Sequence, residues 1–214
     1  MGFGYRVVLI FRMQPRITVC LLLKAPLLGT VKTRLAAGVG AEDALRIYRR
    51  LAEHQLNELP SEWKVEVHFT PATEERLMRT WLAREHVEFF AQPEGDLGVR
   101  LETAQLGAFR RGAEVVILLG GDCPELHCHR LREAEISLRD HDVVIAPASD
   151  GGYALLGTTK PQPKLFWKIP WSTAAVFSET IRRAEEQHLR VATLDLVSDI
   201  DEIGDWERLK HLLA

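Results

Sequence analysis

Short apolar runs alternate with helical patterns along most of this chain, and such alternation is typical of βαβ units. The run at residues 17–23 is almost continuously apolar, as in a strand that is buried on both faces. The run at residues 115–119 has the same character and ends in a glycine-rich turn. Between such runs, Leu45, Tyr48 and Leu51 recur at the spacing of an α-helix. The pattern therefore predicts an α/β domain with a mostly parallel sheet.

The full set of predicted elements fits a doubly wound three-layer α/β/α sandwich with a Rossmann-like (GT-A) sheet of about seven strands. We expect strands at residues 17–23, 65–70, 87–91, 115–119, 142–146, 153–157 and 191–196. We expect helices at residues 41–58, 71–85, 97–111, 125–139, 172–187 and 202–213. Ser172 is the expected N-cap of the fifth of these helices.

Length and composition are compatible with one domain. The 214 residues are 46% hydrophobic and 27% charged, an ordinary balance for a globular protein. We assign residues 17–214 to a single domain and residues 1–16 to an N-terminal extension of unassigned function. The apolar run at residues 7–11 is too short for a signal-peptide core or a membrane span, and Met13 is an alternative start.

Charge and cysteine content narrow the choice of partners. The formal net charge of −3 argues against nucleic acid as the main partner, because domains that bind it are usually basic. Basic residues cluster locally at Lys24, Lys32 and Arg34, which suits a small anionic ligand. Three cysteines without a disulfide-framework spacing favour a reducing compartment. We therefore expect a cytoplasmic protein without a membrane span, and a homodimer stays open.

Polar residues and glycines collect directly after the predicted strands. In a parallel sheet the loops at these ends converge and form the ligand site. The residues are Lys24, Gly29, Lys32, Thr33 and Arg34 after the first strand, Gln92, Gly95, Asp96 and Gly98 after the third, Asp122 after the fourth, Asp150 after the fifth, and Asp199 and Asp201 after the last.

The loop at residues 24–34 has features of a phosphate site. A glycine turn exposes backbone N–H groups, and Lys32 and Arg34 can supply positive charge to phosphate oxygens. It is not a Walker A loop, because Val31 precedes Lys32 and Pro26 stands where that motif has its first glycine. A solvated basic loop before a helix is the alternative.

Three carboxylates are candidate ligands of a divalent ion. Asp122 directly follows a buried strand, and Mg²⁺ typically takes one or two carboxylates together with substrate phosphates. Asp199 and Asp201 follow the last strand at the same edge of the sheet. Helix capping is the alternative, since Asp122 could cap the helix at residues 125–139 and Asp201 the final helix.

The turn at residues 149–152 also has two interpretations. It is compatible with a plain β-turn between two strands, and its glycines would equally let a substrate approach the backbone closely. The cysteines and histidines at residues 123–129 lack the spacing of a structural zinc site, and no nucleophile signature of a hydrolase is present.

Six stretches together resemble a bacterial family of GT-A-like nucleotide-diphosphosugar transferases. They are LKAPLLGTVKTRL at residues 23–35, QPEGDLG at 92–98, GGDCPEL at 120–126, APASDGGY at 146–153, IPWST at 169–173 and DID at 199–201. A more distant similarity is to 2-phospholactate guanylyltransferase, which has a comparable first loop, a carboxylate after the central strand and a late Asp-x-Asp.

The resemblance implies a role for each group of residues. A nucleotide would lie over the first loop, contacting Lys24, Gly29, Lys32, Thr33 and Arg34, with its base or ribose near Gln92, Gly95, Asp96 and Gly98. Mg²⁺ (or Mn²⁺) would be held by Asp122 with Asp199 or Asp201. The second substrate would contact Gly151, Gly152, Tyr153, Trp171, Ser172 and Thr173, and the catalytic residues would be Lys32, Asp122 and Asp150.

Three functions fit these residues. Our first interpretation is Mg²⁺-dependent nucleotidyl transfer from a nucleoside triphosphate to a small phosphorylated acceptor, because this reaction needs positioning and charge neutralisation rather than a protein nucleophile. The second is glycosyl transfer from a nucleotide sugar, with Asp150 as the candidate general base. The third is a nucleotide-binding module without catalysis.

Overall fold

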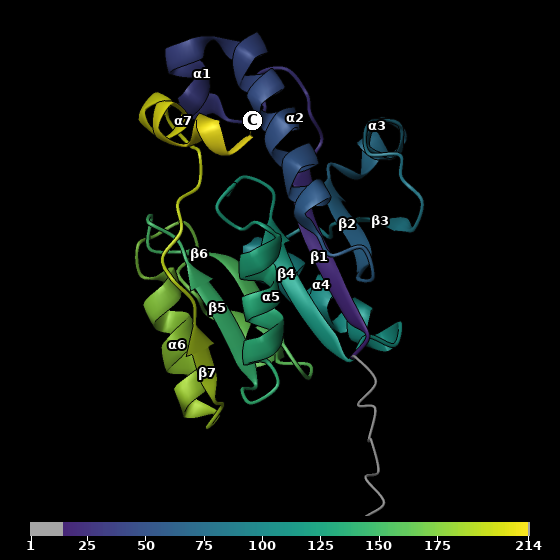
Figure 1. Ribbon diagram of the computed structural model, residues 1–214, viewed down its shortest axis with the longest axis vertical. Coiled ribbons are helices and arrows are strands. Elements are labelled where there is room, and N and C mark those ends of the chain that lie inside the picture. Colours follow the sequence, from purple (N-terminus) through teal and green to yellow (C-terminus); the bar gives the residue numbers. More distant parts are fainter. Residues whose placement is uncertain (1–14, 214) are drawn as a thin grey trace, which may run out of the picture.

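A mostly parallel seven-stranded sheet forms the centre of the domain and confirms the predicted fold class (Figure 1). The computed structural model describes residues 15–213, so the expected extension at residues 1–16 lies almost wholly outside the described residues. The strands are β1 (Ile17–Lys24), β2 (Lys64–Thr70), β3 (Val87–Ala91), β4 (Val115–Gly120), β5 (Val143–Pro147), β6 (Tyr153–Thr158) and β7 (Val191–Thr193). Their order is β3-β2-β1-β4-β6-β5-β7, and β6 runs antiparallel to both of its neighbours.

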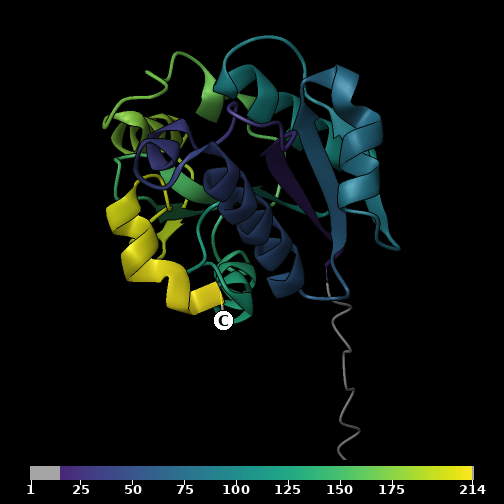
Figure 2. The same ribbon diagram turned by 90° about the horizontal axis from the view of Figure 1, so that it is seen from above.

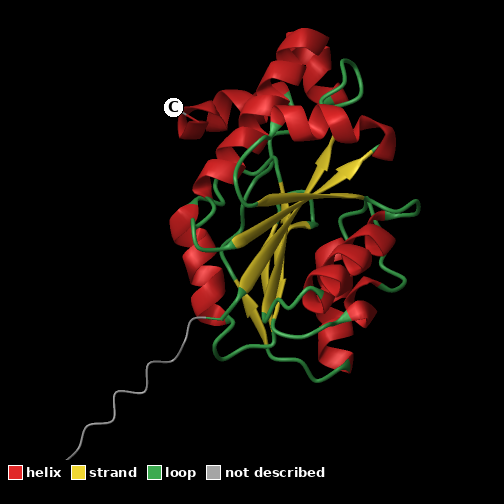
Figure 3. Cartoon of the chain, turned by 90° about the vertical axis from the view of Figure 1, so that its right-hand side faces the viewer, coloured by secondary structure: helices red, strands yellow, loops and turns green. Residues whose placement is uncertain are grey.

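Helices cover both faces of the sheet and complete the three layers (Figure 3). They are α1 (Thr33–Val39), α2 (Ala41–Glu58), α3 (Glu75–Trp81), α4 (Leu97–Arg110), α5 (Cys128–Ser137), α6 (Val176–Glu186) and α7 (Ile203–Leu209), with 3₁₀ turns at Ala72–Glu74, Pro163–Phe166 and Lys210–Leu213. Side chains of α2 and α5 pack on one face, and side chains of α4 and α6 pack on the other. In the described residues no helix has the length and apolar character needed to cross a bilayer.

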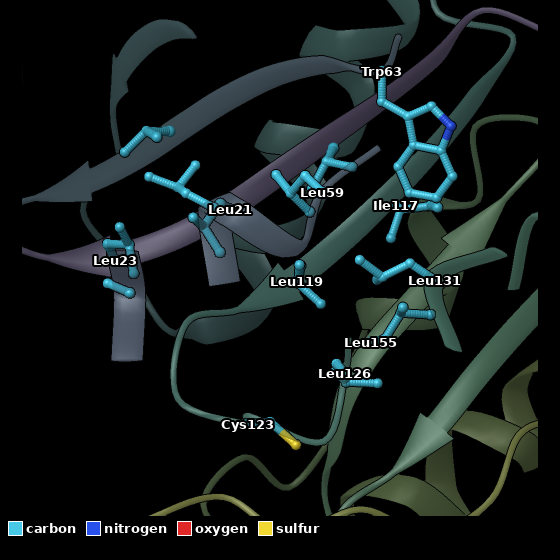
Figure 4. Close-up of a cluster of buried hydrophobic side chains, with 14 of the residues drawn as sticks. Leu21, Leu23, Leu59, Trp63, Ile117, Leu119, Cys123, Leu126, Leu131 and Leu155 are labelled. Atoms are coloured by element: carbon cyan, nitrogen blue, oxygen red, sulfur yellow. The ribbon is translucent and has the colours of Figure 1, made fainter. Parts of the chain in front are cut away.

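The two faces of β1 enter two separate cores. Val19, Leu21 and Leu23 belong to the core under α2 and α5, whereas Cys20 belongs to the core under α4 and α6. This division follows from the strand geometry, because successive side chains point to opposite faces. Figure 4 shows Leu21 near Leu119 of β4, its register partner, in the first core. Full burial of such a leucine contributes about 2 kcal/mol, so the ends of β1 and β4 are firmly fixed.

Helices α1 and α7 lie side by side beyond the carboxyl end of β1 (Figures 1 and 2). A third apolar cluster joins them, in which Leu35 of α1 packs with Ile200 and with Leu209 of α7. This cluster therefore connects the loop after β1 to the C-terminal segment, although the two are far apart in the sequence.

Helix capping was the alternative explanation for Asp122 and Asp201, and the structure shows that neither residue is an N-cap. The helix after β4 begins at Cys128 with His127 as its N-cap, so Asp122 lies too early in the chain to cap it. The last helix has Glu202 as its N-cap, and Asp205 completes a capping box with it. Asp201 is therefore not the cap either, and both carboxylates need another explanation.

Other helix ends also differ from the prediction. Ser172 has a positive φ of 63° and does not cap α6, which begins at Val176. The helix expected at residues 71–85 is a 3₁₀ turn followed by the short α3, which ends at Trp81. Helix α1 was not predicted, because it has only seven residues and contains Gly38, which lowers its helix propensity.

Candidate active site

A cleft of about 350 Å³ opens at the carboxyl ends of β1 and β4, and we call it the first cleft. The residues that line it come from the end of β1 and the loop after it, α2, the ends of β2, β3 and β4, the loop after β4, the start of α4, and the C-terminal segment. They are Leu22, Leu23, Lys24, Thr30, Val31, Lys32, Thr33, Arg34, Tyr48, Thr70, Gln92, Leu97, Arg100, Gly120, Gly121, Asp122 and Asp201. The cleft thus combines four cationic side chains with two carboxylates.

Lys32 is the central side chain of the first cleft. Its ammonium lies 2.9 Å from a carboxylate oxygen of Asp122 and 2.8 Å from one of Asp201, and its side chain is only 6% exposed. The backbone of Lys32 is left-handed, with φ 47° and ψ 46°, at the residue that precedes α1. Such a conformation is unfavourable for a residue with a side chain and is found mostly where the surrounding structure enforces it.

The charges around Lys32 shift one another's pKa values. Burial alone would lower the pKa of Lys32, but the carboxylates of Asp122 and Asp201 outweigh it and raise this pKa above its ordinary value. Burial likewise disfavours the charged form of Asp122, yet the Lys32 ammonium lowers the pKa of that carboxyl. Lys32 and Asp122 are therefore both charged at neutral pH.

Asp199 completes a group of three acids and carries the least compensated charge. Burial and the neighbouring Asp122 and Asp201 raise the pKa of Asp199 to about 6. Arg34 lies 2.8 Å from the second oxygen of Asp201, whereas Asp199 forms no ion pair with any described residue. Two cations therefore face three carboxylates at this point.

Hydrogen bonds hold the two chain segments that carry these acids together. The Ile200 amide donates to the carbonyl of Asp122 at 3.1 Å. The Ser198 amide donates to the Glu125 carboxylate at 2.7 Å, and the Cys123 thiol donates to the Ser198 carbonyl at 3.2 Å. The loop after β4 and the segment before α7 are thus fixed to each other on both sides of the acids.

The three acids fit a hard divalent cation. One carboxylate oxygen from each of Asp122, Asp199 and Asp201 lies within 4.8 Å of the others. Oxygen-only ligands are the set that Mg²⁺ and Mn²⁺ prefer. The uncompensated negative charge of Asp199 would attract a divalent cation even though Lys32 lies nearby. The three acids are therefore compatible with a metal site.

A second pocket of about 240 Å³ lies beside the first cleft. The two cavities share Leu97, Gly120 and Asp122. The remaining lining residues come from the β5–β6 turn, the segment before α6 and the segment before α7: Ala148, Asp150, Gly152, Tyr153, Ala154, Trp171, Ser172, Thr173, Val176 and Asp199. We call this cavity the second pocket.

The β5–β6 turn is both a hairpin turn and a wall of the second pocket. Strands β5 and β6 pair antiparallel, and Gly151 sits in the turn with φ 87°. A Cβ at Gly151 would come within 2.4 Å of the Ala174 carbonyl oxygen, so glycine is required there. The two interpretations of this turn made from the sequence are therefore compatible with each other.

The predicted nucleotide residues divide into two groups. Lys24, Thr33, Arg34 and Gln92 line the first cleft with Lys32, whereas Gly29, Gly95, Asp96 and Gly98 do not. Asp96 caps α4 by accepting a hydrogen bond from the Val99 amide at 3.0 Å. Gly98 is buried against Trp171, whose indole nitrogen would lie 2.7 Å from a Cβ added there.

Tyr48, Leu97 and Arg100 are among the first-cleft residues that were not predicted from the sequence. Tyr48 of α2 accepts a hydrogen bond from the Lys24 amide at 2.9 Å and donates one to the Lys24 carbonyl at 2.7 Å, which fixes the end of β1. Leu97 is 45% exposed between the two cavities, and Arg100 follows one turn later in α4. The signal that could have found Leu97 and Arg100 is their place at the start of the helix after β3.

A second group of metal-type ligands lies inside the protein and has a different role. Cys20, Glu66 and His68 lie close together, but both oxygens of Glu66 are engaged by the guanidinium of Arg111, with Nε at 2.8 Å. Burial disfavours the charged form of Glu66, yet hydrogen bonds from His68 and Arg111 lower the pKa of Glu66 to about 2. This group is an internal ion network.

The mostly parallel sheet with helices on both faces is the GT-A-like architecture that the resemblance implied. Residues 55–173 match the family described as "Uncharacterized protein conserved in bacteria (DUF2064)". The match covers more than half of the chain, and the chain belongs to this family. No curated protein matches it.

Solved structures share the fold over nearly the whole chain. A protein from Desulfovibrio desulfuricans G20, provisionally described as a nucleotide-diphospho-sugar transferase, is 28% identical with a TM-score of 0.83, covering 92% of this chain and 96% of that one. The 4-diphosphocytidyl-2C-methyl-D-erythritol synthase from Anaerococcus prevotii DSM 20548 is 10% identical with a TM-score of 0.59, over 92% and 96%. The inositol-1-phosphate CTP transferase from T. maritima is 14% identical with a TM-score of 0.57, over 94% and 95%. Because the sequence identity is low, the last two similarities show only that the fold is shared.

Proposed function

We propose that this chain is a Mg²⁺-dependent transferase that binds a nucleoside phosphate in the first cleft and transfers a nucleotidyl group from it to a small acceptor. The observation that carries the proposal is the contact of Lys32 with Asp122 and Asp201 at the carboxyl ends of the central strands. Cations and metal-type carboxylates occur together there, and a ligand with several phosphate oxygens needs both.

The cations of the cleft divide into a fixed and an adaptable set. Lys32 is buried and held by two carboxylates, so its ammonium offers a preorganised positive charge at a defined place. Arg34 is 70% exposed and Lys24 is exposed, so both can reorient toward phosphate oxygens. Preorganised charge lowers the barrier to phosphoryl transfer because it need not rearrange during the reaction.

The carboxylates would hold the metal ion and orient the reacting groups. Asp122 and Asp199, with Asp201 at their side, are the residues we assign to Mg²⁺, and the ion would supply charge neutralisation to the phosphates. Asp122 lines both cavities, so we place the transferred group next to it. The small acceptor would enter through the second pocket, where its attacking oxygen can face the first cleft.

Glycosyl transfer from a nucleotide sugar is the second candidate, and one observation favours it. Asp150 is an exposed carboxylate in the second pocket, and its Oδ1 accepts a hydrogen bond from the Gly152 amide at 2.8 Å. A carboxylate held in this way can act as a general base for an acceptor hydroxyl. The free cysteines Cys20, Cys123 and Cys128 agree with a reducing, cytoplasmic location for either enzyme.

A substrate screen separates the two candidates. The full chain is incubated with Mg²⁺, each of the four nucleoside triphosphates or common nucleotide sugars, and a mixture of small acceptors, and products are identified by mass spectrometry. Release of pyrophosphate together with a nucleotidylated product supports nucleotidyl transfer. Release of a nucleoside diphosphate with a glycosylated product supports the alternative, and absence of any turnover with measurable nucleotide binding would leave only a binding module.

A further inference from the structure

The second pocket is lined by acidic but not by basic side chains, and the predicted acceptor site does not explain this. Its lining contains the carboxylates of Asp122, Asp150 and Asp199, and no Lys, Arg or His occurs among the described residues that line it. The first cleft, in contrast, contains four cationic side chains. The two cavities share Asp122, so a molecule that spans them would pass from a cationic environment into an acidic one.

We propose that the second pocket binds an acceptor whose body is an uncharged polyol or an amino sugar, where the body is every part of the acceptor except its reacting group. This inference rests on the proposed function, because it assumes that the reacting group faces the first cleft at Asp122. A phosphate at the reacting end remains acceptable, since Lys32 lies beside Asp122. A second anionic group, in the body of the acceptor within the second pocket, is unfavourable.

The acidic character persists when the neighbouring charges are counted. Lys32 contacts Asp122, but Arg34 pairs with Asp201, which is not part of the second pocket. A divalent ion on Asp122 and Asp199 would neutralise these two carboxylates. Asp150 would still have no cationic partner among the described residues, so the outer part of the pocket keeps a negative charge.

Asp150 is placed to contact a hydroxyl or an ammonium group. Its Oδ1 accepts the Gly152 amide at 2.8 Å, and no described residue donates to its Oδ2. The turn that carries it is tight, because Gly151 packs against the Ala174 backbone. The carboxylate is therefore oriented by its own turn, and its second oxygen is available as an acceptor from a ligand.

Two aromatic residues also line the second pocket. The rings of Tyr153 and Trp171 meet edge to face, with centroids 6.4 Å apart, and both residues line the second pocket. Aromatic faces give apolar contact to the carbon skeleton of a ligand and attract cations electrostatically. A pocket that contains both aromatic rings and carboxylate acceptors suits a sugar or an amino sugar.

The same features disfavour acceptors with an anionic body. A carboxylate or second phosphate in the second pocket would face Asp150 without a cation to compensate it, and such like-charge contacts are an effective basis of specificity. Phospholactate carries a carboxylate besides its phosphate. We therefore infer that this chain does not share the acceptor of 2-phospholactate guanylyltransferase, despite the resemblance.

Ligand-observed NMR titrations of the full chain with four probes test the inference. The probes are glucose, glucosamine, glucuronate and phospholactate, each with and without a saturating nucleoside triphosphate and Mg²⁺. We expect glucosamine to bind tightest, glucose next, and the two anions at least about fivefold more weakly than glucosamine, which is the effect of one exposed charge contact. Equal or tighter binding of glucuronate or phospholactate would overturn the inference.

Two variants show whether Asp150 is the cause. Asp150→Asn should weaken glucosamine about fivefold and leave glucose almost unchanged, because only the charge is lost. Asp195→Asn is the matched control, since Asp195 is 87% exposed and outside both cavities, and it should change neither. The same preference in all three proteins would refute the role of Asp150. If glucosamine binds but no nucleotide does, the proposed function is wrong, whereas the inferred preference of the second pocket for an amino sugar is retained.

Discussion

The Lys32 ammonium lies 2.9 Å from a carboxylate oxygen of Asp122, so a candidate phosphate-binding cation and a candidate metal ligand are in direct contact. A metal ion bound by Asp122 must either share this carboxylate with Lys32 or displace the Lys32 ammonium from it. The positive charges of Lys32 and of the metal repel each other across a short distance. Metal binding and the position of Lys32 are therefore coupled.

Removal of the Lys32 charge should have opposite effects on metal and nucleotide. In Lys32→Met we expect the affinity for Mn²⁺ alone to rise, by about tenfold, because a competing cation is lost. Affinity for a nucleoside triphosphate with Mg²⁺ should fall by about tenfold or more, because a charge-assisted contact is lost. Calorimetric titrations measure both. Lys24→Met is the control, because Lys24 lines the same cleft but is exposed; identical behaviour of the two variants would argue against the coupling.

Loss of the Asp122 charge should impair turnover far more than folding. Asp122 is not a helix cap, and Lys32 keeps its contact with Asp201 in Asp122→Asn. We expect a change in unfolding free energy within about 1 kcal/mol, because the crowding of three acids is also relieved. Turnover should fall by about 10²–10³-fold, the effect of losing one preorganised electrostatic group. A folded variant with unchanged turnover in Mg²⁺ would remove Asp122 from the mechanism.

Gly98→Ala should affect the second pocket more than the first cleft. A Cβ at Gly98 would lie 2.7 Å from the Trp171 indole nitrogen and 2.8 Å from the Phe166 carbonyl oxygen, so Trp171 must move. We expect the KM for the acceptor to rise by about tenfold, with little change in the KM for the nucleotide. Gly204→Ala is the matched control, because an added Cβ meets nothing within 4 Å there. Equal effects on both KM values would contradict this placement of Trp171.

The buried Glu66 network should make stability depend on pH in the acid range. The pKa of Glu66 is about 2 in the folded protein against an ordinary 4.5, so the unfolded state binds the proton first as pH falls. Its stabilisation, about 3 kcal/mol, is fully present above pH ~4.5 and is lost as pH falls toward 2.

Urea unfolding between pH 6 and pH 2.5 measures this dependence. The difference in unfolding free energy between the native chain and Glu66→Gln should shrink as the solution becomes more acidic. Glu88→Gln is the control, because Lys64 lies 3.8 Å from Glu66 and 3.0 Å from Glu88, but Glu88 is 48% exposed. A constant difference across this range for Glu66→Gln would show that the carboxylate is not stabilised by its partners.

Most of the sheet could be predicted from the sequence because its strands carry strong local signals. β1 and β4 are almost continuously apolar, which is typical of strands that are buried on both faces of a parallel sheet. The placement of Asp122 and Asp201 at one edge follows from the same topology, since parallel strands share their carboxyl ends. The short α1 has no such signal, because its formation depends on packing of Leu35 against the C-terminal segment.

The details of the site could not be predicted, because they depend on tertiary contacts. The left-handed backbone of Lys32 places its ammonium between two acids, and no local pattern indicates that conformation. Leu97 and Arg100 look like ordinary helix residues until α4 is positioned at the cleft. The acidity of the second pocket depends on which carboxylates face it, and Asp150 and Asp199 come from distant segments.

Binding of a nucleotide with Mg²⁺ is the central claim, and a thermal shift measurement tests it most directly. A ligand present at about 100 times its Kd stabilises the folded state by roughly 2.7 kcal/mol. In a domain of this size that raises Tm by about 5–10 °C. We predict such a rise for the native chain with at least one nucleoside triphosphate and Mg²⁺, and a much smaller rise after chelation or in Lys32→Met. No rise with any nucleotide at millimolar concentration would contradict a nucleotide site in the first cleft.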